Sequence, residues 1–172
     1  MHVHEAIRKR RSVREFLPTP VPDEILMKVL EAAGLAPSSS NRQQWRFVVV
    51  RDEDRRRSLA RIANSQMWIA SAPVVIAAIS TDPGSIMTCE VPRYAVDTAI
   101  AMDHLTLAAV EEGLDTCWIG AFSQTKAREI LGVSTDCMVV TLMPVGYAAP
   151  THVVAKSRKP LEAIVRYERD SI

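Results

Sequence analysis

The sequence predicts an α+β fold, because helical and strand-like segments are mixed along the chain without alternating strictly. Three apolar runs, at 45–50, 73–79 and 137–147, have the composition of strands. Apolar residues spaced by three and four positions indicate helices, most clearly at 23–34 and 93–113. Helices that cover a sheet in layers therefore describe the chain better than a doubly wound arrangement.

The N-terminal part begins with a short helical pattern at residues 3–9, which leads into an arginine cluster. Prolines in the segment 18–22 predict a stiff extended connector, because each proline also restricts the residue before it. Asp23 stands where the N-cap of the next helix is expected. Gly34 and Pro37 end that helix and lead the chain into a loop rich in serine and asparagine.

The middle of the chain predicts two strands and a helix between them. Residues 45–50 are rich in aromatic and β-branched side chains, which favour a strand. Asp52 is expected to cap a helix that carries Leu59 on its apolar face. The apolar run 73–79 predicts a strand buried on both faces, and a short polar link, 80–92, follows it.

The longest helical pattern ends at Gly113 and carries a narrow stripe of mostly small side chains. The stripe consists of Ala95, Ala99, Met102, Leu105, Thr106 and Ala109. Small side chains let helices approach closely, so this helix is expected at the centre of the core or at a dimer interface.

The C-terminal part predicts two more strands and one more helix. Residues 114–119 suggest a strand, and Ser123 and Gly132 mark the two ends of a helix. The run 137–147 predicts the last core strand, and a polar tail contains the cluster 156–158. At 172 residues the chain is expected to form one domain, 1–172, with a sizeable core.

Composition argues against several classes of function. The net charge of +1 does not favour a nucleic-acid partner, and the basic stretch 51–61 has acidic neighbours and lacks interleaved aromatics. No run approaches the roughly 20 apolar residues that a membrane span needs. The first residues lack the apolar core of a signal peptide, so a cytoplasmic protein is expected.

Common catalytic and cofactor motifs are missing from the sequence. Cys89, Cys117 and Cys137 are too irregularly spaced for a disulfide framework, a zinc site or an iron–sulfur cluster. Neither a Gly-x-Gly-x-x-Gly turn, nor a Walker loop, nor a Gly-x-Ser-x-Gly elbow occurs. We therefore expect neither metal nor self-contained hydrolase chemistry.

Three polar islands are better explained as parts of one anion site. They are Arg10-Arg11-Ser12-Val13-Arg14, the loop 37–45 and Lys156-Ser157-Arg158. Each island alone is ordinary, since basic runs are commonly solvated and serine and asparagine favour turns. A phosphate monoester carries about −1.5 to −2 charges and needs several cations. Together the islands predict a phosphorylated cofactor.

In chain order, Arg-Arg-Ser-Val-Arg-x-Phe, Ala-Pro-Ser-Ser-x-Asn-x-Gln-x-Trp-x-Phe, Cys-Trp-Ile-Gly and Lys-Ser-Arg-x-Pro-Leu resemble the motifs of the nitroreductase family of FMN enzymes. The resemblance spans roughly residues 4–166. It implies an α+β fold with a central, mostly antiparallel sheet flanked by helices. It also implies an intertwined homodimer with FMN at the subunit interface.

The resemblance implies roles for the cationic residues of both chain ends. The phosphate ligands would be Arg10, Ser12, Lys156 and Arg158. Arg11 would lie along the ribityl chain, and Arg14 would face the pyrimidine edge of the flavin. A cation at that edge would stabilise the negative charge that develops when the flavin is reduced.

The resemblance also implies roles for two neutral segments. The other subunit would supply the loop residues Pro37, Ser38, Ser39 and Asn41. The segment beside the isoalloxazine ring would comprise Trp118, Ile119, Gly120 and Ala121. Gly120 permits close approach of the backbone to a flat ring, and Gln43 also matches the family pattern.

The sequence departs from the family pattern in a few places. Gln44 stands where the family commonly has proline, and the link 80–92 is shorter than in larger relatives. The segment 119–121 lacks the acidic residue of some members. Trp68, Tyr94 and Trp118 are candidate pocket walls, although large aromatics are more often core residues.

The resemblance implies a small-molecule oxidoreductase whose chemistry takes place at the flavin N5, without a protein nucleophile. NADH or NADPH would give hydride to FMN, and a nitroaromatic, quinone or similar electron-poor acceptor would then take it. Two alternatives remain open. One keeps the fold but changes the chemistry to flavin fragmentation, dehalogenation or azoline oxidation. The other is a flavin-binding module without catalysis.

Overall fold

A computed structural model describes residues 1–150 and 156–170 of the chain. The helices are α1 (Val3–Lys9), α2 (Asp23–Gly34), α3 (Glu53–Ile62), α4 (Arg93–Glu111) and α5 (Gln124–Leu131). Short 3-10 turns are η1 (Ser39–Asn41), η2 (Met67–Ser71) and η3 (Leu161–Ala163). The strands are β1 (Trp45–Val50), β2 (Val74–Ser80), β3 (Asp115–Thr116) and β4 (Met138–Gly146). These elements confirm the α+β prediction.

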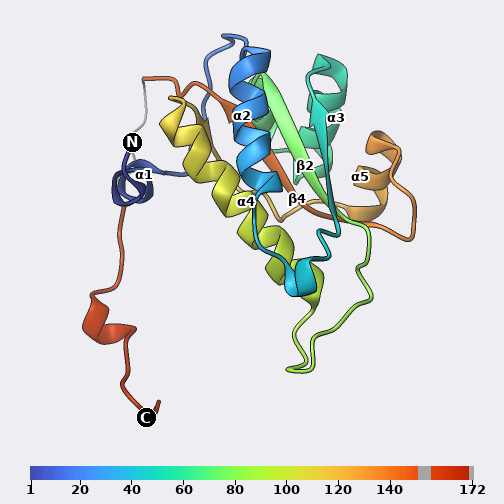
Figure 1. Ribbon diagram of the computed structural model, residues 1–172. Coiled ribbons are helices and arrows are strands. Elements are labelled where there is room, and N and C mark those ends of the chain that lie inside the picture. The colour runs from blue at the N-terminus through green and yellow to red at the C-terminus, as the bar shows by residue number, and fades with distance from the viewer. Residues whose placement is uncertain (151–155, 171–172) are drawn as a thin grey trace.

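The four strands form one antiparallel sheet in the order β1-β2-β4-β3. The two central strands, β2 and β4, therefore have hydrogen-bonded neighbours on both sides, whereas β1 is an edge strand. All seven residues of β2 are buried, as its apolar sequence predicted. The expected central antiparallel sheet flanked by helices is confirmed (Figure 1).

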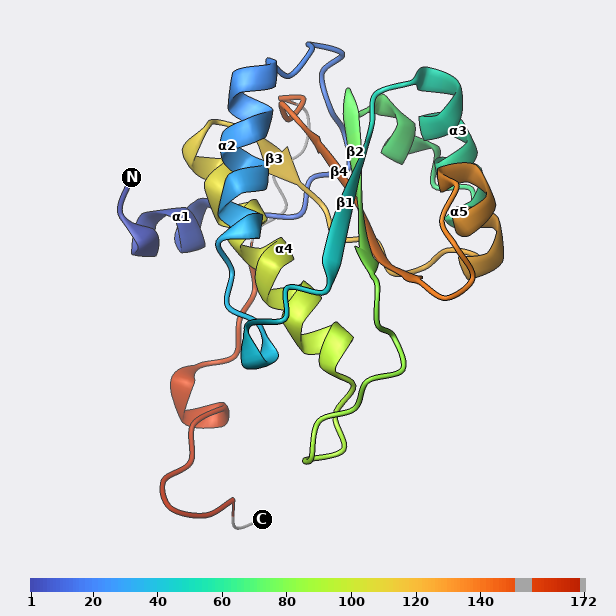
Figure 2. The same ribbon diagram turned by 45° about the vertical axis from the view of Figure 1, so that its right-hand side comes forward.

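Helices cover both faces of the sheet (Figures 1 and 2). Successive side chains of a strand point to opposite faces, and β2 follows this rule. Val74 and Ile76 pack in a core with α2 and α4. Val75 and Ala77 pack in a second core with α3 and α5. The domain is thus a three-layer structure with the sheet in the middle.

The long helix α4 lies at the centre of the first core. Four residues of its expected stripe are buried, namely Met102, Leu105, Thr106 and Ala109. The other two, Ala95 and Ala99, are exposed in the single chain. The N-terminal part of the stripe is therefore not part of the core, so the expectation of a core position is wrong for Ala95 and Ala99. For these two residues a dimer interface stays a prediction.

The start of α2 differs from the sequence expectation. Pro22 occupies the N-cap position, and Asp23 is the first helical residue without a capping hydrogen bond. Its carboxylate forms an ion pair with Arg51 instead. An acid in the first turn still interacts favourably with the positive end of the helix dipole.

The predicted strand at 114–119 is largely missing, because β3 contains only Asp115 and Thr116. The next partner in the β3–β4 register is Pro144, which has no N–H to donate and interrupts the ladder. Ile119 pairs again with Leu142, but only as an isolated bridge. The residues from Cys117 to Gly120 therefore do not continue the regular strand.

The helix ends on the other face follow the sequence more closely. The Asp52 side chain accepts the backbone N–H of Arg55 at 2.9 Å, which confirms the predicted cap of α3. Gly132 ends α5 with a left-handed φ of 65°, as expected of glycine. Ser123 takes the N-cap position of α5 but makes no capping hydrogen bond with its side chain.

The described C-terminal residues 156–170 form an arm that runs away from the body of the chain (Figure 1). Leu161, Ile164 and Tyr167 on this arm are exposed by 69%, 62% and 86%. In the parts of the chain that the structure describes, no helix has the length and apolar character needed to cross a bilayer.

Candidate functional site

The N-terminal cluster is held against the end of the sheet by backbone pairing. Ser12 forms a parallel bridge with Thr116, and the Val13 N–H donates to the Thr116 carbonyl at 3.0 Å. The Arg11 Nε donates to Asp115 Oδ1 at 3.3 Å and fastens the same segment to β3. Arg10 is fixed beside these pairs, at the end of α1, because it caps that helix through its backbone N–H.

A cavity of about 220 Å³ joins this cluster to the segment after β3. Its lining residues are Arg10, Ser12, Thr116, Trp118 and, from α4, Ala99, Asp103 and Thr106. Two residues of the basic cluster and one of the predicted ring-side segment therefore share one hollow. The sequence placed Ala99 and Thr106 in the stripe of small side chains but assigned none of the three α4 residues to the site.

Cations from both ends of the chain converge here. Lys156 Nζ donates to the carbonyls of Ile7 and Arg8, both at 2.8 Å, at the C-terminal end of α1. Partial desolvation, followed by the positive charges of Arg10 and Arg158, lowers the pKa of Lys156 from its usual range. The predicted proximity of the two cationic islands is thus present in a single chain.

This cation cluster suits an anion of high charge. None of the ion pairs among the described residues involves Arg10, Lys156 or Arg158. Three like charges without an acidic partner repel one another, and a phosphate monoester would relieve that repulsion. The donor set therefore fits the phosphorylated cofactor expected from the sequence.

Arg14 lies on the side of the cluster that faces Trp68 and Cys117. Its guanidinium stands 6.0 Å from the centroid of the Trp68 ring, in cation–π geometry. Burial raises the pKa of the Cys117 thiol, against the opposing effects of the Arg14 charge, a Ser12 hydrogen bond and the Arg10 charge. Trp68 packs against the buried cluster that contains Val13, and its ring also contacts the Arg14 guanidinium.

The segment 118–121 presents a mixed surface. Trp118 is 43% exposed, whereas Ile119 is buried. A Cβ added to Gly120 would meet only the Trp118 Nε1, at 3.9 Å. Gly120 and Ala121 are exposed, so the space beside this backbone is open to a flat ligand.

The predicted loop 37–41 is anchored to α4. The Ser39 N–H and Oγ donate to Asp97 Oδ1 at 3.0 and 2.9 Å. The Gln43 N–H donates to Ser38 Oγ at 3.0 Å, and its Nε2 donates to Asn41 Oδ1 at 3.0 Å. Gln43 therefore stabilises the conformation of this loop through hydrogen bonds to two other loop residues, in agreement with a structural role.

The polar link 80–92 packs against the same loop. Ile86 and Pro92 form an isolated antiparallel bridge that narrows the link into a hairpin-like turn. Met87 Sδ lies 3.6 Å from Ser39 Oγ. Tyr94, at the following helix start, is half-buried, and its place in a substrate pocket stays a prediction.

Within one chain the loop and the cation cluster are not brought together. Ala99, Asp103 and Thr106 lie on one face of α4, whereas Asp97 is turned from Ala99 by about 200° about the helix axis. The loop therefore attaches to the side of α4 opposite the cavity. Pro37, at the beginning of the loop, is exposed.

The sequence reasoning missed Asp97 and Asp103. Both are carboxylates inside the apolar pattern of α4, and Asp97 is buried. An acid inside an apolar helical pattern is a signal that sequence alone offers, because such a group is retained only where it has partners. Its partner, Ser39, is 58 residues distant in sequence and could not be named.

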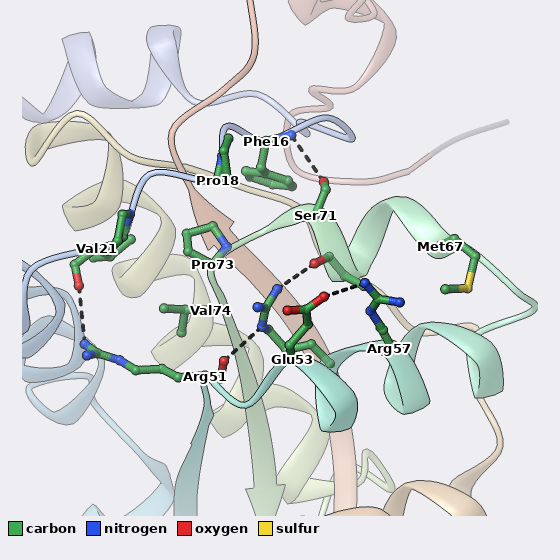
Figure 3. Close-up of a pocket in the computed structure, with 13 residues that line it drawn as sticks. Phe16, Pro18, Val21, Arg51, Glu53, Arg57, Met67, Ser71, Pro73 and Val74 are labelled. Carbon is green, nitrogen blue, oxygen red and sulfur yellow. Dashed lines mark hydrogen bonds and ion pairs between the residues drawn. The ribbon is translucent and has the colours of Figure 1, made fainter.

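A larger cavity of about 780 Å³ lies elsewhere, between the proline connector and the start of α3 (Figure 3). Its arginines are already partnered. Arg51 donates to the Val21 carbonyl at 3.4 Å, Arg56 to backbone carbonyls, and Arg57 pairs with Glu53. No predicted site residue lines this cavity, so it is not the candidate site.

The protein has an α+β fold, and a pocket with a cationic cluster at its edge lies beside the central helix α4. A family model described as "Nitroreductase family" matches residues 7–83 and 66–147. The chain belongs to the nitroreductase family.

Three similar proteins show how widely the likeness extends. A putative NADH dehydrogenase/NAD(P)H nitroreductase from Archaeoglobus fulgidus is 32% identical over 82% of each chain. An FMN reductase [NAD(P)H] from Bacillus subtilis is 30% identical over 96% of this chain and 73% of its own. The structure of an NADPH:FMN oxidoreductase from Vibrio harveyi, complexed with NAD+, superposes with a TM-score of 0.89 at 27% identity, over 99% of this chain and 78% of its own.

Proposed function

We propose that this chain is an FMN-dependent oxidoreductase that uses NADH or NADPH to reduce a small electron-poor acceptor, such as a nitroaromatic or a quinone. The observation that carries the proposal is the convergence of Arg10, Lys156 and Arg158, none of which has an acidic partner among residues 1–150 and 156–170. Family membership and relatives named as FMN reductases support FMN as the phosphorylated ligand.

Residues that line the cavity, together with Lys156 and Arg158 near Arg10, would bind the phosphate group of the cofactor. Arg10, Ser12 and Arg158 would hold the phosphate, together with the Lys156 ammonium hydrogen that α1 does not use. When bound, FMN would accept hydride from the reduced nicotinamide and return it to the acceptor, in ping-pong order.

Two further groups would act on the ring. Arg14, held against Trp68, would place a positive charge at the pyrimidine edge and favour the reduced flavin. The open backbone at Trp118, Gly120 and Ala121 would lie along the isoalloxazine. Arg11 is already paired with Asp115, so it would fasten the site to β3 more than bind the ribityl chain.

The proposal includes a homodimer. The loop with Ser38 and Asn41 sits on the far side of α4 from the cavity of its own chain, so a pocket that contains both must take the loop from a second copy. The exposed apolar side chains of the arm, such as Ile164 and Tyr167, also call for a covering surface.

Absorbance spectroscopy tests the proposal directly. The purified protein is expected to show a flavin band and to lose it under anaerobic conditions when NADH or NADPH is added. Acid release of the chromophore, followed by chromatography, would identify it as FMN. A colourless protein that acquires no flavin band when mixed with FMN would contradict the proposal.

Turnover assays separate the alternatives on the same sample. Dehalogenation, azoline oxidation or flavin fragmentation in place of nitro or quinone reduction would indicate divergent chemistry. Firm FMN retention without nicotinamide oxidation, in the presence of several acceptors, would indicate a non-catalytic module. The cytoplasmic location stays a prediction.

A further inference from the structure

The buried carboxylate of Asp97 is committed to a single residue of the loop. Asp97 is 4% exposed, and its Oδ1 accepts both the N–H and the Oγ–H of Ser39. No ion pair among the described residues involves Asp97. Burial of an unpaired carboxylate is unfavourable unless hydrogen bonds hold it, so these two bonds explain how the group is tolerated.

The loop that Asp97 holds has an unusual backbone. Ser40, Asn41 and Gln43 have φ angles of 54°, 52° and 51°, in the left-handed region that non-glycine residues rarely adopt. Such a conformation persists where surrounding contacts over-determine it. The double hydrogen bond at Ser39 is the contact that ties this part of the loop to a rigid helix.

The hydrogen bonds also give the residues of the loop different roles. The Ser39 N–H donates to Asp97, and the Ser39 hydroxyl donates to Asp97 at 2.9 Å with Met87 Sδ as a more distant acceptor at 3.6 Å, so Ser39 is an anchor. The side-chain oxygens of Ser38 and Asn41 accept from Gln43, which leaves the Ser38 hydroxyl hydrogen and the Asn41 Nδ2 hydrogens for a ligand.

We propose that Asp97 is a positioning residue for the flavin site of the partner subunit. Through Ser39 it sets the direction in which Ser38 and Asn41 present their donors to the cofactor bound by the other chain. This inference rests on the proposed function, because it needs FMN and a homodimer. It also assigns two roles to α4. One face of the helix lines the pocket of the same chain, and Asp97, on the opposite face, supports the pocket of the partner chain.

Single substitutions give the first test. Asp97→Ala removes both acceptor bonds and is expected to raise the FMN dissociation constant roughly 10- to 100-fold. Asp97→Asn keeps an oxygen in the Oδ1 position and is expected to stay within about threefold of the wild type. Asp136→Asn, an exposed acid far from the loop in sequence, is the control and should leave the constant unchanged. Fluorescence titration with FMN measures all three.

Ser39→Ala keeps the test usable if Asp97→Ala does not fold. This variant loses the hydroxyl donor but keeps the backbone N–H, so its FMN affinity should fall between that of Asp97→Asn and Asp97→Ala. Circular dichroism and sedimentation would establish that each variant remains a folded dimer before its affinity is interpreted.

Subunit mixing distinguishes a role of Asp97 in the partner's pocket from a structural role within its own chain. One chain carries Arg10→Ala with Arg158→Ala, the other carries Asp97→Ala, and two different affinity tags isolate the mixed dimer. If Asp97 serves the partner, one pocket receives both defects and the other receives none. About one firmly bound FMN per mixed dimer is therefore expected, whereas each parent homodimer retains little.

The outcomes are separable. A mixed dimer in which neither pocket holds FMN firmly would mean that Asp97 acts on its own chain's site, and it would overturn the inference. An Asp97→Ala protein with wild-type affinity would overturn it as well. A wild-type protein that binds no FMN would remove the proposed function, and this inference with it.

Discussion

Arg10 and Arg158 are the single side chains on which the proposed phosphate site depends most. Neither makes an ion pair within the described chain, so neither is needed to neutralise an acid of its own fold. Their proximity to Lys156 is the basis for proposing a strongly anionic ligand.

The double variant Arg10→Ala with Arg158→Ala is expected to weaken FMN binding by several kcal/mol, at about 1.5–3 kcal/mol for each charge-assisted contact. Quenching of flavin fluorescence measures the loss. Arg55→Ala with Arg61→Ala removes two exposed arginines of α3 and serves as the charge-matched control. Equal affinity in both double variants would refute the phosphate assignment.

The pH dependence of binding tests Lys156. Partial desolvation and the neighbouring Arg10 and Arg158 lower its pKa below the ordinary 10.5 in the free protein. A bound phosphate dianion would favour the ammonium form, so binding takes up a proton once the pH passes that lowered pKa. FMN affinity is expected to fall as the pH rises through this range. Isothermal titration in buffers of different ionisation heat measures the proton uptake.

Lys156→Met provides the comparison for this pH profile. It is expected to bind FMN more weakly at neutral pH and to lose the proton uptake assigned to Lys156. Ionisation of FMN itself affects both proteins alike, so the difference between the two profiles reports on Lys156. Identical profiles would show that this lysine only caps α1 through Ile7 and Arg8.

At the residue scale, the sequence predicted that the two cationic islands lie close together, whereas the third island, the loop 37–45, is not brought to them within one chain. Position in the cluster alone does not distinguish Arg10 from Arg11, and only the resemblance gave them separate roles. The structure separates them, because β3 brings Asp115 to Arg11. Such pairing depends on which strand lies alongside the cluster, and that information is not local in the sequence.

Elements with local signals were predicted well. Asp52 and Gly132 act through groups a few residues away, so their caps could be recognised without a fold. The run 114–119 failed for the opposite reason. Its strand requires hydrogen-bond donors from a neighbour, and only the antiparallel register reveals that Pro144 stands opposite Cys117.

Gly146 at the end of β4 shows a steric constraint on the sheet. A Cβ at this position would lie 2.5 Å from Pro73 Cδ and 3.3 Å from Phe16 Cδ1. The proline ring cannot rotate away, so Gly146→Ala is expected to destabilise the fold by about 1–3 kcal/mol. Thermal denaturation followed by circular dichroism measures the effect. Gly84→Ala, where the added carbon meets nothing within 4 Å, is the matched control. Equal melting temperatures for the two variants would show that β4 and the connector adjust freely.

The whole molecule has features that a single chain does not explain. The arm 156–170 carries exposed apolar residues, and none of its residues belongs to a described core cluster. The sequence resemblance implied an intertwined dimer, and the placement of the Ser39 loop relative to the cavity supplies a geometric reason for proposing one. Composition and periodicity could not predict this placement, because they do not show which face of α4 a loop distant in sequence will contact.

Removal of residues 160–172 tests the arm. The truncated chain keeps Lys156 and Arg158 and is expected to fold, because the described cores do not use the arm. The proposed dimer should dissociate, after truncation, at protein concentrations where the full chain stays paired, since Leu161, Ile164 and Tyr167 are lost. Sedimentation equilibrium measures the shift. The substitution Glu162→Gln, which keeps the apolar side chains, is the control, and an undiminished dimer after truncation would contradict the role of the arm.

The position of β1 has a consequence for handling this protein. β1 lies at the edge of the sheet, so part of its backbone hydrogen-bonding capacity faces outward, along a strand rich in valine and aromatic residues. Open edges of this kind are templates for irregular self-assembly, and the charged side chain of Arg46 is a modest safeguard. The protein is therefore expected to associate irregularly through β1 when it is concentrated during expression and storage.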